Sequence, residues 1–422
     1  MLIKSFEIIC LLLIFVNYCS CQNEKYNNNS ITYNSSKIIG NSLSNNSLQS
    51  KNDILSYKNV KIDCSRVSGI ADGILSWFSY LQKSTSSSLK VFIKLYTRNN
   101  SLSHILINPD DNINLNLSYF NIERKSVFII HGFMTPATES WMDHMKNAYL
   151  EYEDVNVFVI DWTEHSFVWN YYKAIENSLE VGKIVSNLIA KITRYYLTIN
   201  NNKTWGKIHL IGHSLGAHIC GIIADDIKMS NGKWTVTRIT GLDPAQPCFV
   251  GSNLTLNKYD APFVDVIHTN GRQIIPGIAL GAVDDIGTID FYVNGGYFQP
   301  SCNKTPIMLF KMLKTIIDLS REAFCSHMIA IDYFTESIKI ASVKSKQKFW
   351  SFKWDGTYKT AENIIGNDCS DNDCIVMGIE ADKYSIQGKF FVSTAMSYPY
   401  HGPIVTNDIN EILNQLEVDI KH

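Results

Sequence analysis

The first candidate for chemistry is a serine that lies in a turn between two glycines. The run from Lys207 to Gly221 reads KIHLIGHSLGAHICG, an apolar, strand-like stretch that breaks at Gly-His-Ser-Leu-Gly and continues with small, helix-compatible residues. A sharp strand-to-helix turn lifts the Ser214 hydroxyl clear of the backbone, and flanking glycines leave room for close approach. An ordinary turn is the alternative, because G-x-S-x-G alone is a weak signal. The strand-turn-helix context favours a nucleophile elbow.

A nucleophilic serine needs a base, and such an elbow gives the chain order Ser, then Asp or Glu, then His. His327, in FCSHMIAIDYF, lies far downstream, where a loop could bring it over the elbow. Four other histidines are weaker candidates, because they end strands or adjoin a serine whose hydroxyl they cannot readily face: His131, His213, His218 and His268.

Two aspartates compete for the acid that orients the base. Asp243, in ITGLDPAQPCF, ends a strand just after Ser214, and the following proline halts the chain there. Asp265 lies inside FVDVIHT, where a buried structural carboxylate is about as plausible. The residues alone leave both open.

The elements that must position these side chains alternate between strand-like and helical runs. Continuous Val/Ile stretches separated by helices indicate a mostly parallel sheet that is buried on both faces. We therefore predict an α/β architecture from these runs: LKVFIKLYT, SVFIIHGF, VNVFVIDW, KIHLIG, VTRITGLD and FVDVIHT, with a long periodic helix from Tyr171 to Leu197.

Composition limits the class of protein. The chain has 422 residues, of which 45% are hydrophobic and 18% charged, enough to bury one large core or two. Its net charge of -2 gives no electrostatic basis for binding nucleic acid.

The N-terminus has the character of a secretory signal. Residues 1–21 contain a lysine, an apolar stretch too short to favour an anchor, and then small residues, so we expect removal near Cys21. Residues 22–57, rich in Asn and Ser, are expected to be a disordered leader. A glycosylating route would fit eight N-x-S/T sequons, some of them accidental: Asn28, Asn34, Asn45, Asn99, Asn116, Asn202, Asn253 and Asn303.

Taken together, the motifs between Cys64 and Tyr398 resemble the pancreatic lipase family, which includes secreted triacylglycerol lipases, phospholipases A1 and yolk proteins. The segments that carry the resemblance occur in the family's order: FIIHGF, VIDW, GHSLGAH, ITGLDPAQPCF, FVDVIHTNG, IDFYVNGG and CSHMIAIDYFTESI. The resemblance implies an α/β-hydrolase fold with a lid over the active site, in a domain at 58–400 followed by a C-terminal tail at 401–422.

The resemblance also assigns roles to residues. It implies Ser214 as nucleophile, His327 as base and Asp243, rather than Asp265, as the acid. Backbone N–H groups of Phe133 and Leu215 are implied as oxyanion donors. No metal or organic cofactor is required by this chemistry.

Two departures from the family pattern alter the expectations. The family's calcium site follows PCF, but here the segment VGSNLTLNKYDAPF is short and offers Asp260 alone as a carboxylate, with Asn257 where another acid is expected. We therefore expect no calcium site. Longer members continue into a β-sandwich domain, whereas this sequence ends about 25 residues after KFFVSTAMSYPY, so we expect neither that domain nor dependence on a colipase.

Cysteine positions point to a lid. In the family, the pair matching Cys302 and Cys325 forms the disulfide at the base of the lid, and the pair in DCSDNDC resembles a second small loop. Cys220 is expected to be a buried thiol, with Cys64 and Cys248 as a candidate third bridge. Periodicity alone favours a core helix for the intervening segment, but its place between the cysteines favours an amphipathic lid with apolar residues that include Phe310, Leu313 and Ile317.

Lid length guides the substrate class. The 22 residues between Cys302 and Cys325, and the long loop from His268 to Gly296, resemble the long-lid triacylglycerol lipases. We therefore expect acylglycerol hydrolysis at a lipid–water interface, with phospholipase A1 activity as the alternative. A yolk-protein-like carrier without activity is disfavoured because Ser214, Asp243 and His327 are all present, and an apolar lid disfavours small soluble esters. The sequence does not indicate the oligomeric state.

Overall fold

The computed structural model describes residues 89–109, 119–135, 140–166, 168, 171–199, 204–230, 233–271, 279–302, 311–367, 369 and 374–421, with the backbone alone at 199, 311–320, 419 and 421. Two short strands, β1 (Ile31–Thr32) and β2 (Lys61–Ile62), also pair with each other. Otherwise, the predicted signal and leader segments lie outside the described residues.

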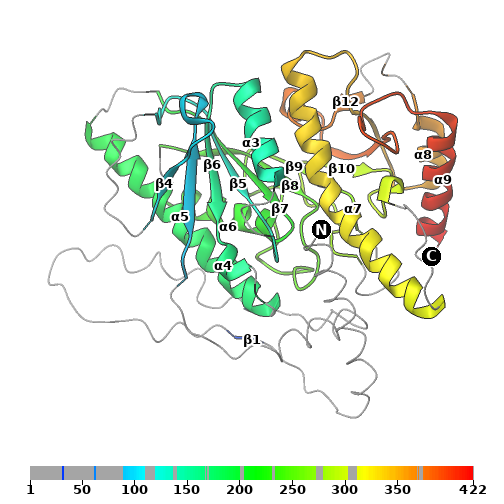
Figure 1. Ribbon diagram of the computed structural model, residues 1–422, viewed down its shortest axis with the longest axis horizontal. Coiled ribbons are helices and arrows are strands. Elements are labelled where there is room, and N and C mark those ends of the chain that lie inside the picture. Colours follow the sequence, from blue (N-terminus) through cyan, green and yellow to red (C-terminus); the bar gives the residue numbers. More distant parts are fainter. Residues whose placement is uncertain are drawn as a thin grey trace, which may run out of the picture.

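An 11-stranded sheet forms the centre of the molecule (Figure 1), in the order β12-β11-β13-β10-β9-β8-β7-β5-β6-β3-β4. The strands from β13 to β6 run parallel, and an antiparallel pair closes each edge. The strands are β3 (Phe92–Tyr96), β4 (Ile105–Ile107), β5 (Ser126–Ile130), β6 (Asn156–Asp161), β7 (Ile208–His213), β8 (Val236–Leu242), β9 (Phe263–His268), β10 (Ile289–Val293), β11 (Trp350–Lys353), β12 (Cys374–Val376) and β13 (Gly388–Val392).

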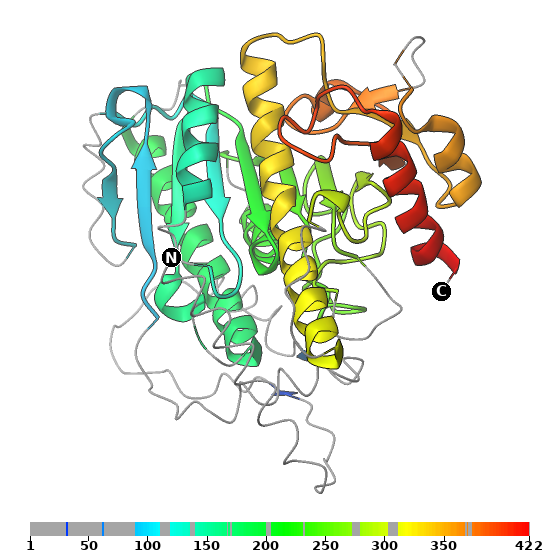
Figure 2. The same ribbon diagram turned by 45° about the vertical axis from the view of Figure 1, so that its right-hand side comes forward.

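Helices cover both faces of this sheet. The helices are α3 (Ser140–Tyr152), α4 (Thr163–Ser166), α5 (Tyr171–Ile199), α6 (Leu215–Met229), α7 (Lys311–Ser342), α8 (Tyr358–Ile364) and α9 (Thr406–Lys421), with 3-10 turns η2 (Arg98–Asn100), η3 (Pro300–Cys302) and η4 (Ala381–Lys383). Figures 1 and 2 show α3 and α7 side by side in front of the sheet, and α5 packs with α6 on the opposite face.

Burial explains why the central strands read as continuous apolar runs. Every residue of β5, β7 and β10 is buried. Alternate side chains of β5 point to opposite faces of the sheet. Phe128 and Ile130 pack in the core under α5 and α6. Val127 and Ile129 pack in the core under α3 and α7. The predicted α/β-hydrolase architecture, a mostly parallel sheet between helices, is confirmed.

The C-terminal tail that we set apart at residue 401 forms part of the packed fold. Its helix α9 lies against α8 at the edge of the sheet (Figure 2). Ile412 and Leu416, one turn apart on α9, are fully buried in a cluster with Trp354 and Phe391. Because these two apolar residues are buried, the packed domain extends beyond residue 400.

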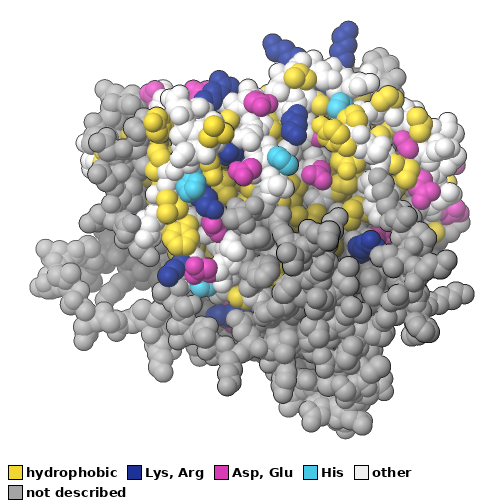
Figure 3. Space-filling view, in the orientation of Figure 1, with side chains coloured by type: hydrophobic (Ala, Val, Ile, Leu, Met, Phe, Trp, Pro, Cys, Tyr) yellow, Lys and Arg dark blue, Asp and Glu magenta, His cyan; other side chains and the backbone are white. Residues whose placement is uncertain are grey.

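The face of the molecule drawn in Figure 3 shows no single dominant charge. Acidic and basic side chains are interspersed on the face that carries α3 and α7 (Figure 3). No helix in the described ranges has the length and apolar character needed to cross a bilayer.

Candidate active site

Ser214 occupies a strained turn between a strand and a helix. It follows the last residue of β7 and precedes the first residue of α6, with φ 56° and ψ −123°. A side chain on Gly212 would meet the backbone carbonyl of Gly216 at 2.2 Å, so the turn is this tight only because both positions are glycine. A serine in such a conformation costs about 1–3 kcal/mol, which the surrounding packing must offset. The local geometry is that of an elbow.

Asp243 and His327 are in direct contact. Asp243 follows β8 and is fully buried, and its Oδ2 lies 2.6 Å from His327 Nδ1. Its other oxygen, Oδ1, accepts the backbone N–H groups of Thr269 at 2.8 Å and Asn270 at 3.0 Å. Because an ionised carboxylate only accepts, His327 carries its proton on Nδ1, which leaves Nε2 as the basic nitrogen of the neutral ring.

His327 lies in the middle of α7, whereas the sequence suggested that a loop could bring it over the elbow. Three neighbouring contacts fix this part of the helix. The disulfide between Cys302 and Cys325 has an S–S distance of 2.04 Å, and Ser326 Oγ accepts the Gln299 N–H at 2.8 Å. The His327 backbone carbonyl oxygen also lies 3.0 Å from Nε2 of His213, the residue before Ser214. A helix can place the histidine because these contacts fix its register against the sheet.

The turn after β5 lies directly against the serine. A Cβ atom on Gly132 would be 2.8 Å from Ser214 Cβ and 3.3 Å from Ser214 Oγ, so this turn approaches the hydroxyl as closely as a glycine allows. The next backbone amide belongs to Phe133. On the other side, Leu215 is the first residue of α6, whose amide has no carbonyl partner one turn earlier in the helix. The roles of the Phe133 and Leu215 amides as oxyanion donors stay a prediction.

His131 supports the turn after β5 and has no free nitrogen for catalysis. Its ring stacks on Trp162 with centroids 5.4 Å apart, and Trp162 donates its backbone N–H to Nε2 and its indole N–H to the His131 carbonyl. Burial lowers the pKa of His131 to about 4, so the ring stays neutral.

Asp265, the rival acid, belongs to a different buried group. Arg238 donates to both of its carboxylate oxygens, at 2.9 and 2.8 Å, and also to the carbonyls of Gly378 and Ile379. Thr240 adds a third hydrogen bond to Oδ1. A bidentate partner and complete burial give Asp265 a structural role. The signal for this pair was present in the sequence as an arginine inside the apolar run VTRITG.

Two of the other candidate histidines, His268 and His218, are also engaged away from the serine. His268 Nε2 pairs with Asp290 at 2.9 Å, while its Nδ1 meets the Ala282 carbonyl. His218 lies on α6, where Nε2 donates to the Ala245 carbonyl and Nδ1 accepts from Leu256. These pairings hold loops that follow β8 and β9.

Asp260 does not have the surroundings of a calcium ligand. Both of its carboxylate oxygens are occupied by Asn257, through the backbone N–H at 2.9 Å and the side-chain amide at 2.7 Å. Within the described ranges, no group of three or more His, Cys, Asp or Glu side chains is arranged to hold a metal. Calcium needs six to eight oxygen ligands, which these two residues do not supply. The donors at this position therefore do not fit calcium.

The predicted disulfide between Cys302 and Cys325 is confirmed, and the pair in DCSDNDC, Cys369 and Cys374, also forms a disulfide. Cys220 is a free, buried thiol, and burial raises its pKa. Cys248 is disulfide-bonded, while its proposed partner Cys64 lies outside the described residues.

The predicted lid is described only in part. Phe310 lies outside the described residues, and Leu313 and Ile317 fall in the backbone-only region at the start of α7. From Lys311 onward this segment is one continuous helix with the part that carries His327. A cover over the serine stays a prediction.

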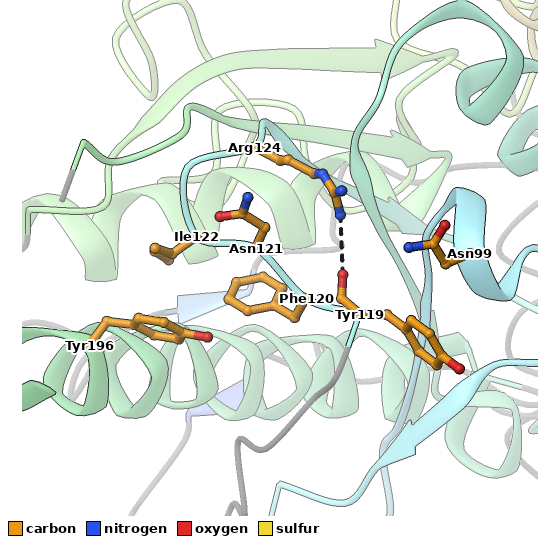
Figure 4. A pocket seen from close by; sticks show the side chains of 7 residues that line it. All are labelled: Asn99, Tyr119, Phe120, Asn121, Ile122, Arg124 and Tyr196. Atoms are coloured by element: carbon orange, nitrogen blue, oxygen red, sulfur yellow. Dashed lines mark hydrogen bonds between the residues drawn. The ribbon is translucent and has the colours of Figure 1, made fainter. Parts of the chain in front are cut away.

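A hollow of about 300 Å³ lies at the other end of the sheet (Figure 4). It is lined by residues that include Tyr119, Arg124 and Tyr196, and Arg124 donates to the Tyr119 carbonyl. Arg124 precedes the first residue of β5, whereas the elbow lies at the C-terminal ends of the parallel strands. This hollow is therefore separate from the candidate active site.

Comparison with known proteins agrees with the motifs. A family model described as Lipase matches residues 75–400. Pancreatic triacylglycerol lipase of Myocastor coypus is 34% identical over 302 residues, which cover 71% of this chain and 62% of that protein. The chain belongs to the pancreatic lipase family. Pancreatic lipase-related protein 2 of Mus musculus is 32% identical over 317 residues, covering 72% of this chain and 61% of that protein.

Family membership alone does not establish activity. The inactive pancreatic lipase-related protein 1 of Mus musculus is 33% identical over 308 residues, covering 71% of this chain and 61% of its own. This lipase-family chain thus spans about three fifths of the length of these relatives. Among solved structures, a soluble variant of monoglyceride lipase from Saccharomyces cerevisiae is 16% identical, covers 39% of this chain and 44% of that chain, and has a TM-score of 0.23.

Proposed function

We propose that this lipase-family chain hydrolyses carboxylic esters of lipids through Ser214, His327 and Asp243. The observation that carries the proposal is the 2.6 Å contact between His327 Nδ1 and Asp243 Oδ2. The helix α7 that carries His327 is also bonded to His213, the residue before Ser214. Buried contacts hold each of these groups, as nucleophilic catalysis requires.

The proposed reaction proceeds in two halves. His327 Nε2 takes the proton of Ser214 as Oγ bonds to the ester carbonyl carbon, and Asp243 stabilises the imidazolium. The oxyanion accepts from the amides of Phe133 and Leu215, each contact being worth about 3–4 kcal/mol in such sites. The alcohol leaves with the proton from His327. Water then attacks the acyl carbon and gives its proton to His327. His327 returns this proton to Ser214 Oγ as the bond between Oγ and the acyl carbon breaks and the fatty acid leaves.

Acylglycerols at an interface are the proposed substrates. The long segment between Cys302 and Cys325 supports this choice, because three acyl chains need a wide apolar rim around the opened pocket. The printed name of the Myocastor coypus relative, a triacylglycerol lipase, also supports it. Phospholipase A1 activity is the alternative.

The test is to assay purified protein on triolein and on phosphatidylcholine side by side, with Ser214→Ala as the matched control. We expect release of fatty acid from triolein at the higher rate. Dominant phosphatidylcholine hydrolysis would replace the substrate proposal. Failure of Ser214 to react with a fluorophosphonate would favour a non-catalytic carrier instead.

The start of α7 provides a second test. Replacing residues 303–318 with a Gly/Ser linker keeps the disulfide and the buried Ala323 while removing most of the proposed lid. We expect triolein hydrolysis to fall far more than hydrolysis of a soluble short-chain ester. An equal fall on both substrates would make the segment core structure.

Secretion is part of the proposal. Among the sequons in described parts of the chain, Asn99 and Asn253 are both exposed, as glycan acceptors must be. A mobility shift of the secreted protein after glycosidase treatment, reduced in Asn99→Gln and Asn253→Gln, is expected. Retention of the full-length protein inside cells would contradict this part.

A further inference from the structure

His213 connects the elbow directly to the helix of the base. It is the last residue of β7, next to Ser214, and its side chain is buried. Its Nε2 lies 3.0 Å from the backbone carbonyl oxygen of His327, and the two imidazole rings approach to 4.6 Å between centroids at 50°. The neighbour of the proposed nucleophile thus touches the proposed base.

The direction of this hydrogen bond fixes the tautomer of His213. A carbonyl oxygen only accepts, so the proton lies on Nε2. The other nitrogen, Nδ1, is buried and has no hydrogen-bond partner among the described residues. The His327 carbonyl is therefore the one polar anchor that the described structure gives this ring. Burying a polar ring for a single hydrogen bond is costly where an aliphatic side chain would fit.

The surroundings of His213 favour the uncharged form of its ring. Burial lowers the pKa of His213 well below that of an exposed imidazole, and the nearby ring of His327 adds to the shift. A charged ring at this distance would oppose the imidazolium that forms on His327 during catalysis. His213 remains an uncharged donor while its neighbour changes charge.

We infer that His213 is a positioning residue, whose Nε2–H holds the His327 backbone at the level of the elbow so that the base stays aligned with Ser214. This inference rests on the proposed function. A carbonyl within a helix has a second lone pair beyond the one that its own helix uses. The added bond ties α7 to the end of β7, while the contact with Asp243 fixes the ring of His327.

A pair of variants separates donation from packing. In His213→Gln the side-chain amide keeps a donor at a reach similar to Nε2, whereas His213→Met fills similar space without one. On a soluble short-chain ester, with rates divided by the fraction of reactive serine, we expect the methionine variant to lose about 10- to 100-fold in kcat with little change in KM. The glutamine variant should stay within about fivefold of wild type, because it preserves the donor.

The outcomes are decisive in both directions. Equal losses in kcat for the two variants, or an unchanged kcat in the methionine variant, would overturn the inference. If the two variants have equal melting temperatures but unequal kcat, the inference is supported. A merely structural role would change the melting temperature and kcat together.

Nitrogen NMR of histidine-labelled Ser214→Ala protein provides a readout that does not depend on activity. We expect a neutral, Nε2-protonated His213 throughout pH 5–8. The opposite tautomer would contradict the contact itself. An inactive wild type with the expected tautomer would instead reject the proposed function while leaving the contact in place.

Discussion

Gly281→Ala should disable the site although it replaces none of the proposed catalytic residues. A Cβ atom at this position would lie 2.3 Å from Asp243 Oδ2 and 2.4 Å from Oδ1, whereas ordinary contacts begin near 3.4 Å. The backbone of this segment cannot easily yield, because Gly281 donates to the Asn270 carbonyl and its neighbour Ala282 donates to that of Pro244. The carboxylate must therefore move by about 1 Å.

That displacement decides the magnitude. The bond between Asp243 and His327 is 2.6 Å long, so a shift of about 1 Å breaks it. A misplacement of this size costs about 100-fold, and losing the orienting carboxylate altogether costs about 10⁴-fold in a serine triad. We expect kcat/KM on a soluble short-chain ester to fall between these limits, with Asp243→Asn as the reference for full loss.

The control is a second glycine whose substitution gives a clash elsewhere. A Cβ atom on Gly182 would meet Ile222 Cγ2 at 2.5 Å, between α5 and α6. Gly182→Ala should lower the melting temperature but keep kcat per reactive serine near wild type. If Gly281→Ala retains kcat/KM within threefold of wild type, the reasoning that places Asp243 in the reaction is refuted.

Three further predictions concern single groups. Ser214→Ala should abolish ester hydrolysis while secretion continues, and residual activity within tenfold of wild type would exclude Ser214 as the nucleophile. Burial raises the pKa of Asp260 to about 6, so ionisation of this carboxyl group destabilises the fold. The destabilisation is absent below pH 4 and reaches up to about 3 kcal/mol above pH 6. Asp260→Asn should therefore raise the melting temperature at pH 7.5 but not at pH 4, and equal shifts at both pH values in scanning fluorimetry would contradict the assignment. EDTA should leave activity and melting temperature nearly unchanged, and a loss restored specifically by calcium would show that other ligands exist.

The strands and the elbow could be predicted because they follow from local rules. Continuous Val/Ile runs indicate strands buried on both faces, and the glycines around Ser214 mark the turn. The choice between Asp243 and Asp265 could not be made from the residues, because both follow or lie within buried strands. It depends on a long-range fact, that Arg238 on β8 lies beside Asp265 on β9.

Helix placement was less predictable than strand placement. The sequence suggested that a loop could bring His327 over the elbow, but this residue lies within α7. The periodic segment before it resembles either a core helix or a lid, and periodicity does not distinguish the two. Its register depends on contacts with residues as distant as His213 and Gln299. The helix α9 could not be placed from the sequence for the same reason. Its apolar residues belong to the core only because they pack against α8, which is a long-range contact.

Backbone strain occurs at the C-terminal ends of three neighbouring strands, and positive φ angles are also found at Cys248, Asn294 and Lys344. The turn after β5 contains Met134 at φ 52°, the turn after β7 contains Ser214 at φ 56°, and β8 is followed by Asp243 at φ 42°. If folding alone mattered, glycine would serve each of these positions at lower cost. Strain of about 1–3 kcal/mol per residue persists only where the surroundings fix the conformation, and here the surroundings are the close approach of Gly132 and the two amides that bind Asp243. The same contacts that hold these residues in disfavoured conformations therefore determine where their side chains point, which is why the strained turns and the proposed catalytic groups coincide.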